Sequence, residues 1–319
     1  MSGRGAGLLV VLLAACTGDP ADGVRGPNLR VVVVTHGQSA DPFWSIVSNG
    51  AHAAGEDLGI DVEYQAPLSF DMVEMANLIE AAAASRPDGL VVSIPDPAAL
   101  GGAIRAAVGA GIPVVSTNSG DDAWARLGAI AHVGQPEYEA GVAAGERLSG
   151  SGVTRALCVN HEVGNAALDR RCAGLRAGLA ASGGTVEVLA VDLADPDAAR
   201  ERIAGALAAR PETDGVLALG PAGAAPALAA VRGIDAARRP ALATFDLSPE
   251  VLRAVESGEI AFAVDQQPFL QGYLPVVLLA AHARAGVAPG GGGVVATGPG
   301  FVTRENAAAV IELSAEGLR

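Results

Sequence analysis

Two large aromatic residues, Phe43 and Trp44, stand side by side in the segment "SADPFWSIVSNG" (residues 39–50), in a chain that is only 3% aromatic. Aromatic rings either fill a core or cover the flat apolar face of a bound molecule. Neighbouring side chains on a helix do not point the same way. We therefore expect at least one ring to line a binding cleft, while the other is free to pack beneath its helix.

Polar residues end several strongly apolar runs of the chain. Thr35-His36 and Asn118 do so in the first half, and Asn160-His161 and Asp246 do so in the second. Their side chains donate and accept hydrogen bonds, as recognition of a hydroxyl-rich molecule requires. The two histidines could instead bind a metal, but no HxxxH or CxxC spacing supplies further ligands. We expect neutral histidines that donate hydrogen bonds, with no metal and no cofactor.

The elements that carry these residues alternate between strand and helix. A nearly continuous β-branched run predicts a parallel strand buried on both faces at 29–36, and further strands are predicted at 60–67, 88–95 and 112–118. Helical periodicity predicts helices at 42–59, 72–87 and 98–111, the first of which starts with Pro42. This order predicts a doubly wound α/β domain, whose ligands bind beyond the carboxyl ends of the strands.

The second half of the chain repeats the first. "VVVVTH", ending at His36, matches "ALCVNH", ending at His161, and "PVVSTN" from Pro113 matches "PALATFD" from Pro240. A nearly constant spacing predicts two similar doubly wound lobes with a cleft between their strand ends.

The first 16 residues, "MSGRGAGLLVVLLAAC", resemble a bacterial lipoprotein signal. The resemblance implies cleavage before Cys16, a lipid on its sulfur, and a protein held in the periplasm or on the outer face of the cell membrane. Residues 17–28 then form a flexible tether. The alternative is an ordinary secretory signal with a chance cysteine. In an oxidising compartment Cys158 and Cys172 either form a disulfide or remain two buried thiols.

Residues 30–319 resemble the type I periplasmic binding proteins for simple sugars, the ribose-binding-protein family. The resemblance is carried, in order, by "DPFW", "GIPVVSTNS", "NAALDRRCAGL" and "FDLSPEVLRAVESGEIAFAVDQQPFLQG". It implies two lobes joined by a three-strand hinge. The N-terminal lobe takes residues 29–133 and 267–294, and the C-terminal lobe takes 134–266 and 295–319.

The resemblance also implies a set of ligand contacts. Phe43 and Trp44 would lie against a sugar ring, with Asp41 bonded to a hydroxyl. The other implied contacts are Asn118 and Ser119, which replace an Asp-Arg pair, and Arg171, Asp246 and Gln266, for which Gln267 is the alternative. Gly220-Pro221 stands where the family often has a polar pair, so Asn160, His161 or Asn165 would compensate.

The function implied is capture of a small neutral sugar or polyol for the permease of an ABC importer, by a monomer that closes about its hinge. Alternatives of the same fold are a protein for an amino acid or furanone autoinducer, or a sugar sensor for a membrane signalling partner. No GxGxxG, P-loop or GxSxG motif indicates an enzyme. A net charge of −14 disfavours nucleic acid, and an export signal stands where a repressor would carry its helix-turn-helix.

Overall fold

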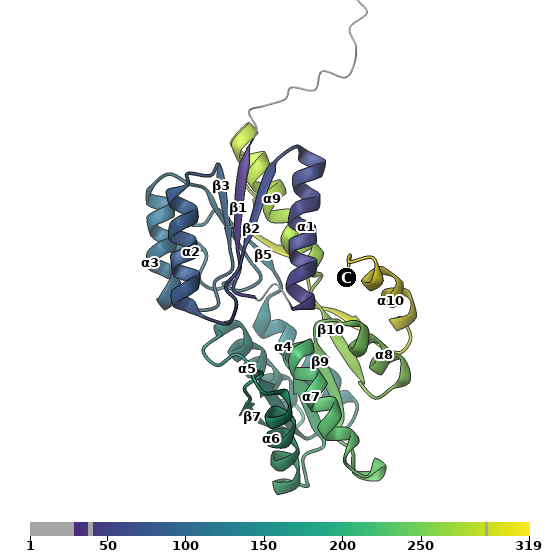
Figure 1. Ribbon diagram of the computed structural model, residues 1–319. Helices are drawn as coiled ribbons and strands as arrows, with labels where there is room; N and C mark the ends of the chain where they lie inside the picture. Colours follow the sequence, from purple (N-terminus) through teal and green to yellow (C-terminus); the bar gives the residue numbers. More distant parts are fainter. Residues whose placement is uncertain (1–28, 38–40, 291–292) are drawn as a thin grey trace, which may run out of the picture.

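A computed structural model describes residues 29–37, 41–290 and 293–319, which form two lobes, one above the other in Figure 1. Each lobe is built on one six-stranded sheet. The predicted signal, lipidated Cys16 and tether lie outside the described residues. No helix of the described part has both the length and the hydropathy to cross a membrane.

Lobe 1 contains the sheet β11-β5-β4-β3-β1-β2, whose strands are all parallel. Its elements are β1 (Arg30–Val34), α1 (Pro42–Leu58), β2 (Asp61–Gln65), α2 (Met72–Ala84), β3 (Gly89–Val92), α3 (Pro97–Gly109), β4 (Val114–Thr117), β5 (Ala131–Gly134), α9 (Pro268–Ala285) and β11 (Val294–Ala296). Helices α1 and α9 pack together on one face of the sheet, and α2 and α3 pack together on the other (Figure 1).

Lobe 2 contains the sheet β12-β10-β9-β8-β6-β7. Its elements are α4 (Glu137–Gly150), β6 (Arg155–Asn160), α5 (Ala166–Ala180), β7 (Thr185–Ala190), α6 (Pro196–Ala209), β8 (Gly215–Ala218), α7 (Pro221–Arg232), β9 (Ala241–Phe245), α8 (Pro249–Ser257), β10 (Phe262–Asp265), β12 (Gly300–Val302) and α10 (Ala307–Ala315). All its strands are parallel except β12, which runs antiparallel to β10.

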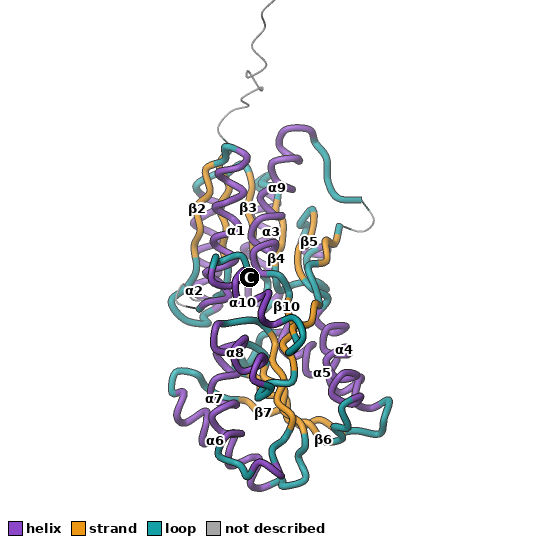
Figure 2. Tube along the Cα trace, turned by 90° about the vertical axis from the view of Figure 1, so that its right-hand side faces the viewer, coloured by secondary structure: helices purple, strands orange, loops and turns teal. Residues whose placement is uncertain are grey.

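The two sheets have the same strand order, with β6 to β10 taking the places of β1 to β5. The repeat and the predicted pair of doubly wound lobes are therefore confirmed. The chain passes between the sheets three times, after β5, after β10 and after β11, as Figure 2 shows from the side. All three crossings lie at the level where the lobes meet.

Burial follows position in the sheet. The central strands β3, β4 and β8 are buried throughout because helices cover both faces, whereas the edge strands β2 and β7 are partly exposed. Each lobe has an apolar cluster on either side of its sheet. The sheets are thereby rigid platforms that hold the loops at their carboxyl ends.

Close helix packing fixes the two helices that start at the cleft. A Cβ on Gly272 of α9 would lie 1.8 Å from the Val47 carbonyl oxygen of α1, and one on Gly141 of α4 would lie 2.3 Å from the Arg171 carbonyl oxygen of α5. Only glycine allows backbones to approach so closely. These contacts set the positions of the first turns of α1 and α5.

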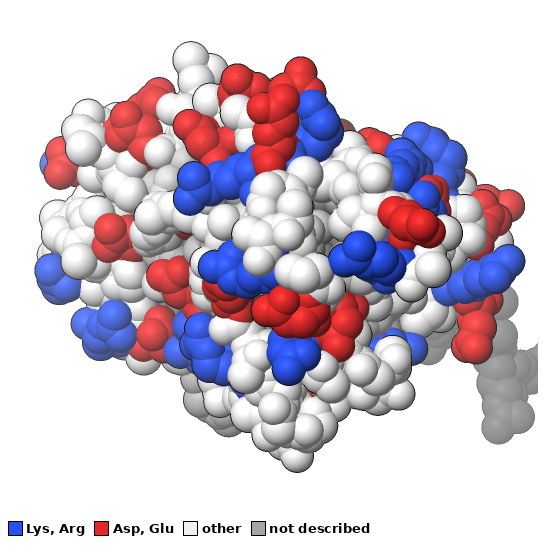
Figure 3. Space-filling view, turned by 90° about the horizontal axis from the view of Figure 1, so that it is seen from below, with Lys and Arg blue, Asp and Glu red and all other residues white. Residues whose placement is uncertain are grey.

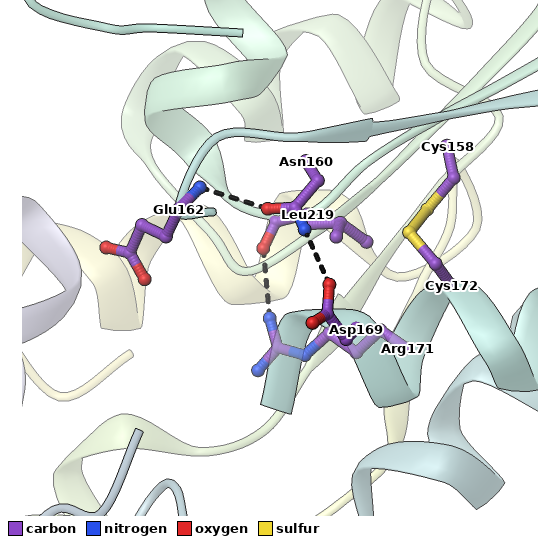
Figure 4. Close-up of a disulfide and its surroundings, with 7 residues drawn as sticks. All are labelled: Cys158, Asn160, Glu162, Asp169, Arg171, Cys172 and Leu219. Carbon is purple, nitrogen blue, oxygen red and sulfur yellow. Dashed lines mark hydrogen bonds between the residues drawn. A yellow bond between two sulfur atoms is a disulfide. The ribbon is translucent and has the colours of Figure 1, made fainter. Parts of the chain in front are cut away.

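The structure joins Cys158 of β6 to Cys172 of α5 by a disulfide. The bond ties α5 to the strand it follows, one residue from Arg171 (Figure 4).

Candidate ligand-binding site

A narrow cavity of about 40 Å³ lies between the lobes, beyond the carboxyl ends of both sheets. It is lined by His36, Asp41, Phe43, Trp44, Asn118, His161, Glu162, Asn165, Leu168, Arg171, Leu219, Gly220, Pro221, Asp246 and Gln266. Larger grooves of about 350 and 680 Å³ lie at the amino ends of the strands, away from these polar groups. Of these three, only the interlobe cavity joins polar groups from both halves of the chain.

Phe43 and Trp44 form the aromatic wall of the cavity, and both are 5% exposed. Their ring centroids are 5.0 Å apart in an edge-on arrangement, and the Trp44 ring also meets His36 at 4.7 Å. Asp41 holds the start of α1 because its Oδ1 accepts the Phe43 amide N–H at 2.9 Å. A Cβ on Gly37 would lie 1.8 Å from the indole, so glycine there makes room for Trp44.

His36 presents a neutral ring to the cavity. Burial, with a smaller contribution from the charge of Arg171, lowers its pKa to about 3. Its Nδ1 lies 2.8 Å from the Ser93 hydroxyl oxygen, which also accepts the His36 backbone N–H. When the hydroxyl donates to Nδ1, the ring proton stays on Nε2, which faces lobe 2.

Arg171 lies at the floor of the cavity, 3% exposed, with its guanidinium 4.4 Å above the Phe245 ring. Its Nε and Nη2 donate to the two carboxylate oxygens of buried Glu137 at 2.6 and 2.9 Å. Its Nη1 donates to the Leu219 carbonyl oxygen at 2.9 Å, as Figure 4 shows. Burial alone would lower the pKa of Arg171, but the carboxylates of Glu137, Asp246 and Glu162 together outweigh this effect and raise it.

The two parallel hydrogen bonds that an arginine can donate to a carboxylate are therefore directed at Glu137 and not at a ligand. A guanidinium has five N–H groups. Three are used within the protein, which leaves one on each terminal nitrogen. Nη1 also lies 3.7 Å from Asp246 Oδ2, so the remaining N–H groups face an acidic part of the cavity lining.

A chain of polar side chains links the two lobes through the hinge. Gln266 Nε2 donates to Asp246 Oδ1 at 2.7 Å, and Asn118 Nδ2 donates to Gln266 Oε1 at 3.3 Å. Asn118 and Asp246 end the equivalent strands β4 and β9, and both adopt positive φ, which asparagine and aspartate tolerate better than most residues. Burial raises the pKa of Asp246 to about 7, although Arg171 at 3.7 Å acts in the opposite direction.

Lobe 2 adds polar groups from the β6–α5 loop. Asn165 caps α5, accepting the Ala167 N–H with Oδ1, and its Nδ2 donates to Glu162 Oε2 at 2.7 Å. Burial raises the pKa of Glu162 and lowers that of His161 to about 4. His161 is therefore neutral near pH 7.

Several contacts hold the lobes against each other. The Ala166 N–H of lobe 2 donates to the Pro95 carbonyl oxygen of lobe 1 at 2.9 Å. Arg170 lies 3.3 Å from Asp121 and 3.5 Å from Asp122. Glu162 Oε2 lies 4.0 Å from His36 Nε2. With so small a cavity, these contacts describe a nearly closed cleft.

The structure brings together almost all the residues predicted for the site. Ser119 does not line the cavity and instead donates to Asn118 Oδ1 at 2.9 Å. Asn160 is not among the lining residues either, and its Nδ2 donates to Asp169 Oδ1 (Figure 4). Sequence reasoning missed Glu162, although it follows the polar strand end at His161, and Glu137, for which the sequence carries no local signal. No three metal-ligating side chains of the described residues form a candidate metal site.

Comparisons with known proteins agree with this geometry. The family described as "Periplasmic binding protein domain" matches residues 31–286. The crystal structure of a carbohydrate transporter protein from Acidothermus cellulolyticus, in complex with myo-inositol, is 38% identical with a TM-score of 0.86, over 92% of this chain and all of that one. A periplasmic sugar-binding protein from Legionella pneumophila is 27% identical with a TM-score of 0.78, over 84% of this chain and 98% of that one.

A curated relative, the xylose/arabinose-binding protein of Sulfolobus acidocaldarius, is 24% identical over 79% of this chain, which spans 66% of that protein's length. The family match covers most of the chain, and the fold and the interlobe cavity are those expected from the resemblance. The chain belongs to the periplasmic binding protein family and has the type I fold of its sugar-binding members.

Proposed function

We propose that this protein captures an uncharged monosaccharide or cyclic polyol between its lobes and delivers it to the permease of an ABC importer. The observation that carries the proposal is the interlobe cavity, where an aromatic wall faces neutral and charged hydrogen-bonding groups from both lobes. Rings cover the C–H face of such a ligand, and the polar groups meet its hydroxyls. Closure shields these hydrogen bonds from competing water.

The ligands of the relatives narrow the choice. The structure from Acidothermus cellulolyticus holds myo-inositol, and the curated relative is named for xylose and arabinose. All three are compact polyols without charge, and the residues that we assign to contact such a ligand are Asp41, Phe43, Trp44, His36, Asn118, His161, Asn165, Arg171, Asp246 and Gln266. Free amino acids fit less well, because the charge of Arg171 is already balanced by the two-pronged pair with Glu137.

Isothermal titration calorimetry with myo-inositol, D-xylose, L-arabinose and D-ribose tests the proposal. At least one should bind with a micromolar or lower Kd and raise the melting temperature by mass action. Trp44→Ala should weaken that binding more than tenfold, whereas Tyr138→Ala, a change at a partly exposed ring outside the cavity, should not. The proposal fails if none of these polyols binds. Binding of an amino acid in their place would count further against it.

We also propose that the protein is exported, cleaved before Cys16 and lipid-anchored there, and that it acts as a monomer without chemical change to its ligand. The sequence of residues 1–16 and the extracytoplasmic family support this. Acidic and basic side chains alternate over the end of lobe 2 (Figure 3), so this face offers no basic surface to nucleic acid. Cys16→Ala should move the protein from the membrane fraction to the soluble fraction, and an unchanged distribution would refute the anchor.

A further inference from the structure

The cavity contains more acidic than basic groups. Three of its lining side chains are carboxylic acids, Asp41, Glu162 and Asp246, and among the described lining residues Arg171 alone carries a guanidinium. The charge of Arg171 is matched by Glu137, which takes two of its N–H groups. The lining histidines, His36 and His161, are neutral near pH 7.

Glu162, like Asp41, has no arginine within ion-pair distance among the described residues, whereas Asp246 lies 3.7 Å from Arg171. The Glu162 carboxylate accepts one hydrogen bond from the neutral amide of Asn165. The ring nearest to it, 4.0 Å away across the lobes, is that of His36. Figure 4 shows Glu162 extending from the end of β6. The charge of Arg171 favours the ionised form of Glu162, but burial has the larger effect and raises its pKa.

Closure strengthens the effect of this carboxylate. Glu162 of lobe 2 and His36 of lobe 1 both line the cavity, so the carboxylate faces the space that is enclosed when the lobes meet. Water is then excluded, and charges interact more strongly than in solvent. A negative group on the ligand would be repelled at this point, whereas an ammonium group would be attracted.

We propose that Glu162 makes the cleft select ligands by charge: neutral polyols and polyols with a protonated amine bind, and their anionic relatives are rejected. This specificity rests on the proposed polyol-binding function and extends it to amino sugars and aminocyclitols. Sugar acids and sugar phosphates of similar shape are excluded.

Calorimetry at pH 7 with two matched sets of probes tests the inference. One set is myo-inositol, scyllo-inosamine and myo-inositol 1-phosphate, and the other is D-glucose, D-glucosamine and D-glucuronate. In the set whose neutral member binds, the amine should bind at least as tightly as the neutral compound. The anion should bind at least about tenfold more weakly, as even a partly screened charge repulsion produces.

The variant Glu162→Gln separates charge from shape. Glutamine keeps the size of the side chain and can still accept from Asn165. In this variant the ratio of the affinity for the amine to the affinity for the anion should fall by about tenfold or more. Glu139→Gln, an exposed change on α4 that removes the same net charge, should leave the wild-type ratios unchanged.

Each result is decisive. If neutral polyols bind but Glu162→Gln leaves the amine-to-anion ratio unaltered, charge selection by Glu162 is wrong while the proposed function stands. If the wild-type protein binds the anion and the neutral compound with equal affinity, charge selection by Glu162 is also wrong while the proposed function stands. If no neutral probe binds, the polyol function fails, and the inference fails with it. Circular dichroism confirms that the variants are folded.

Discussion

The buried pair of Arg171 and Glu137 gives the sharpest test of how this cleft is built. Glu137 is fully buried and Arg171 is 3% exposed, and two hydrogen bonds of 2.6 and 2.9 Å join them. Glu137→Gln leaves the guanidinium charged in a site from which water is excluded. The nearest remaining carboxylate is that of Asp246, 3.7 Å away.

Removing one partner of a buried ion pair typically costs about 3–5 kcal/mol, because the other charge is left without compensation. We expect Glu137→Gln to lower the free energy of unfolding by about 3 kcal/mol, at the lower end of that range, since Asp246 compensates in part. Urea denaturation followed by far-UV circular dichroism measures the change. Arg171 should also lose its orientation, so ligand affinity should fall.

The same chain offers a matched control. Arg232 donates to Glu259 through Nε and Nη2, both at 2.8 Å, but this pair is 49% and 36% exposed. Glu259→Gln should cost about 1 kcal/mol or less, because water screens the pair. If Glu137→Gln costs no more than Glu259→Gln, burial does not give the Arg171 pair its importance, and our account of the floor of the cleft is wrong.

Three further predictions concern the wall, the disulfide and the acid of the hinge network. Gly37→Ala should displace the Trp44 indole and weaken polyol binding more than tenfold in calorimetry, with little change in the circular dichroism spectrum. An unchanged affinity would contradict the close packing of Gly37 against the Trp44 indole. Replacing both Cys158 and Cys172 by alanine should lower the free energy of unfolding in urea by about 3 kcal/mol, the value for a loop of this length, and no loss would contradict it. The pKa of Asp246 is raised, so the folded state binds more protons than the unfolded state, and this residue's contribution to stability falls as pH rises from the ordinary aspartate pKa to about 7. The free energy of unfolding of Asp246→Asn, measured by urea titration, should therefore rise relative to that of the wild type between pH 4 and pH 7. A difference between the two proteins that stays constant with pH would refute the raised pKa of Asp246.

Much of the fold could be predicted because its signals are local. The apolar runs, the prolines at helix starts and the repeated pattern of the two halves depend only on residue order. The structure places α1 at Pro42–Leu58, where residues 42–59 were predicted as helix. The polar residues that end β1, β4 and β9 were found the same way, because parallel strands bring their carboxyl ends to one edge.

The partners of the charged residues could not be predicted in this way. Arg170 is 33% exposed and lies within ion-pair distance of two aspartates of the other lobe, a contact that nothing near it in the sequence indicates. Glu137 lies 34 residues before Arg171, and nothing in the sequence between them indicates the contact. These pairs depend on how α4 packs on α5 and on how the lobes meet.

The sequence by itself determined the alternation of elements, the duplicated lobe and the set of polar strand ends, because spacing along the chain encodes periodicity and therefore which residues share a face. Only the tertiary structure decided which charged side chains lie against one another. It turned the bidentate face of Arg171 towards Glu137 and brought Glu162 up to His36. Such contacts form between elements distant in sequence, and burial, which exists only in the folded chain, sets their strength.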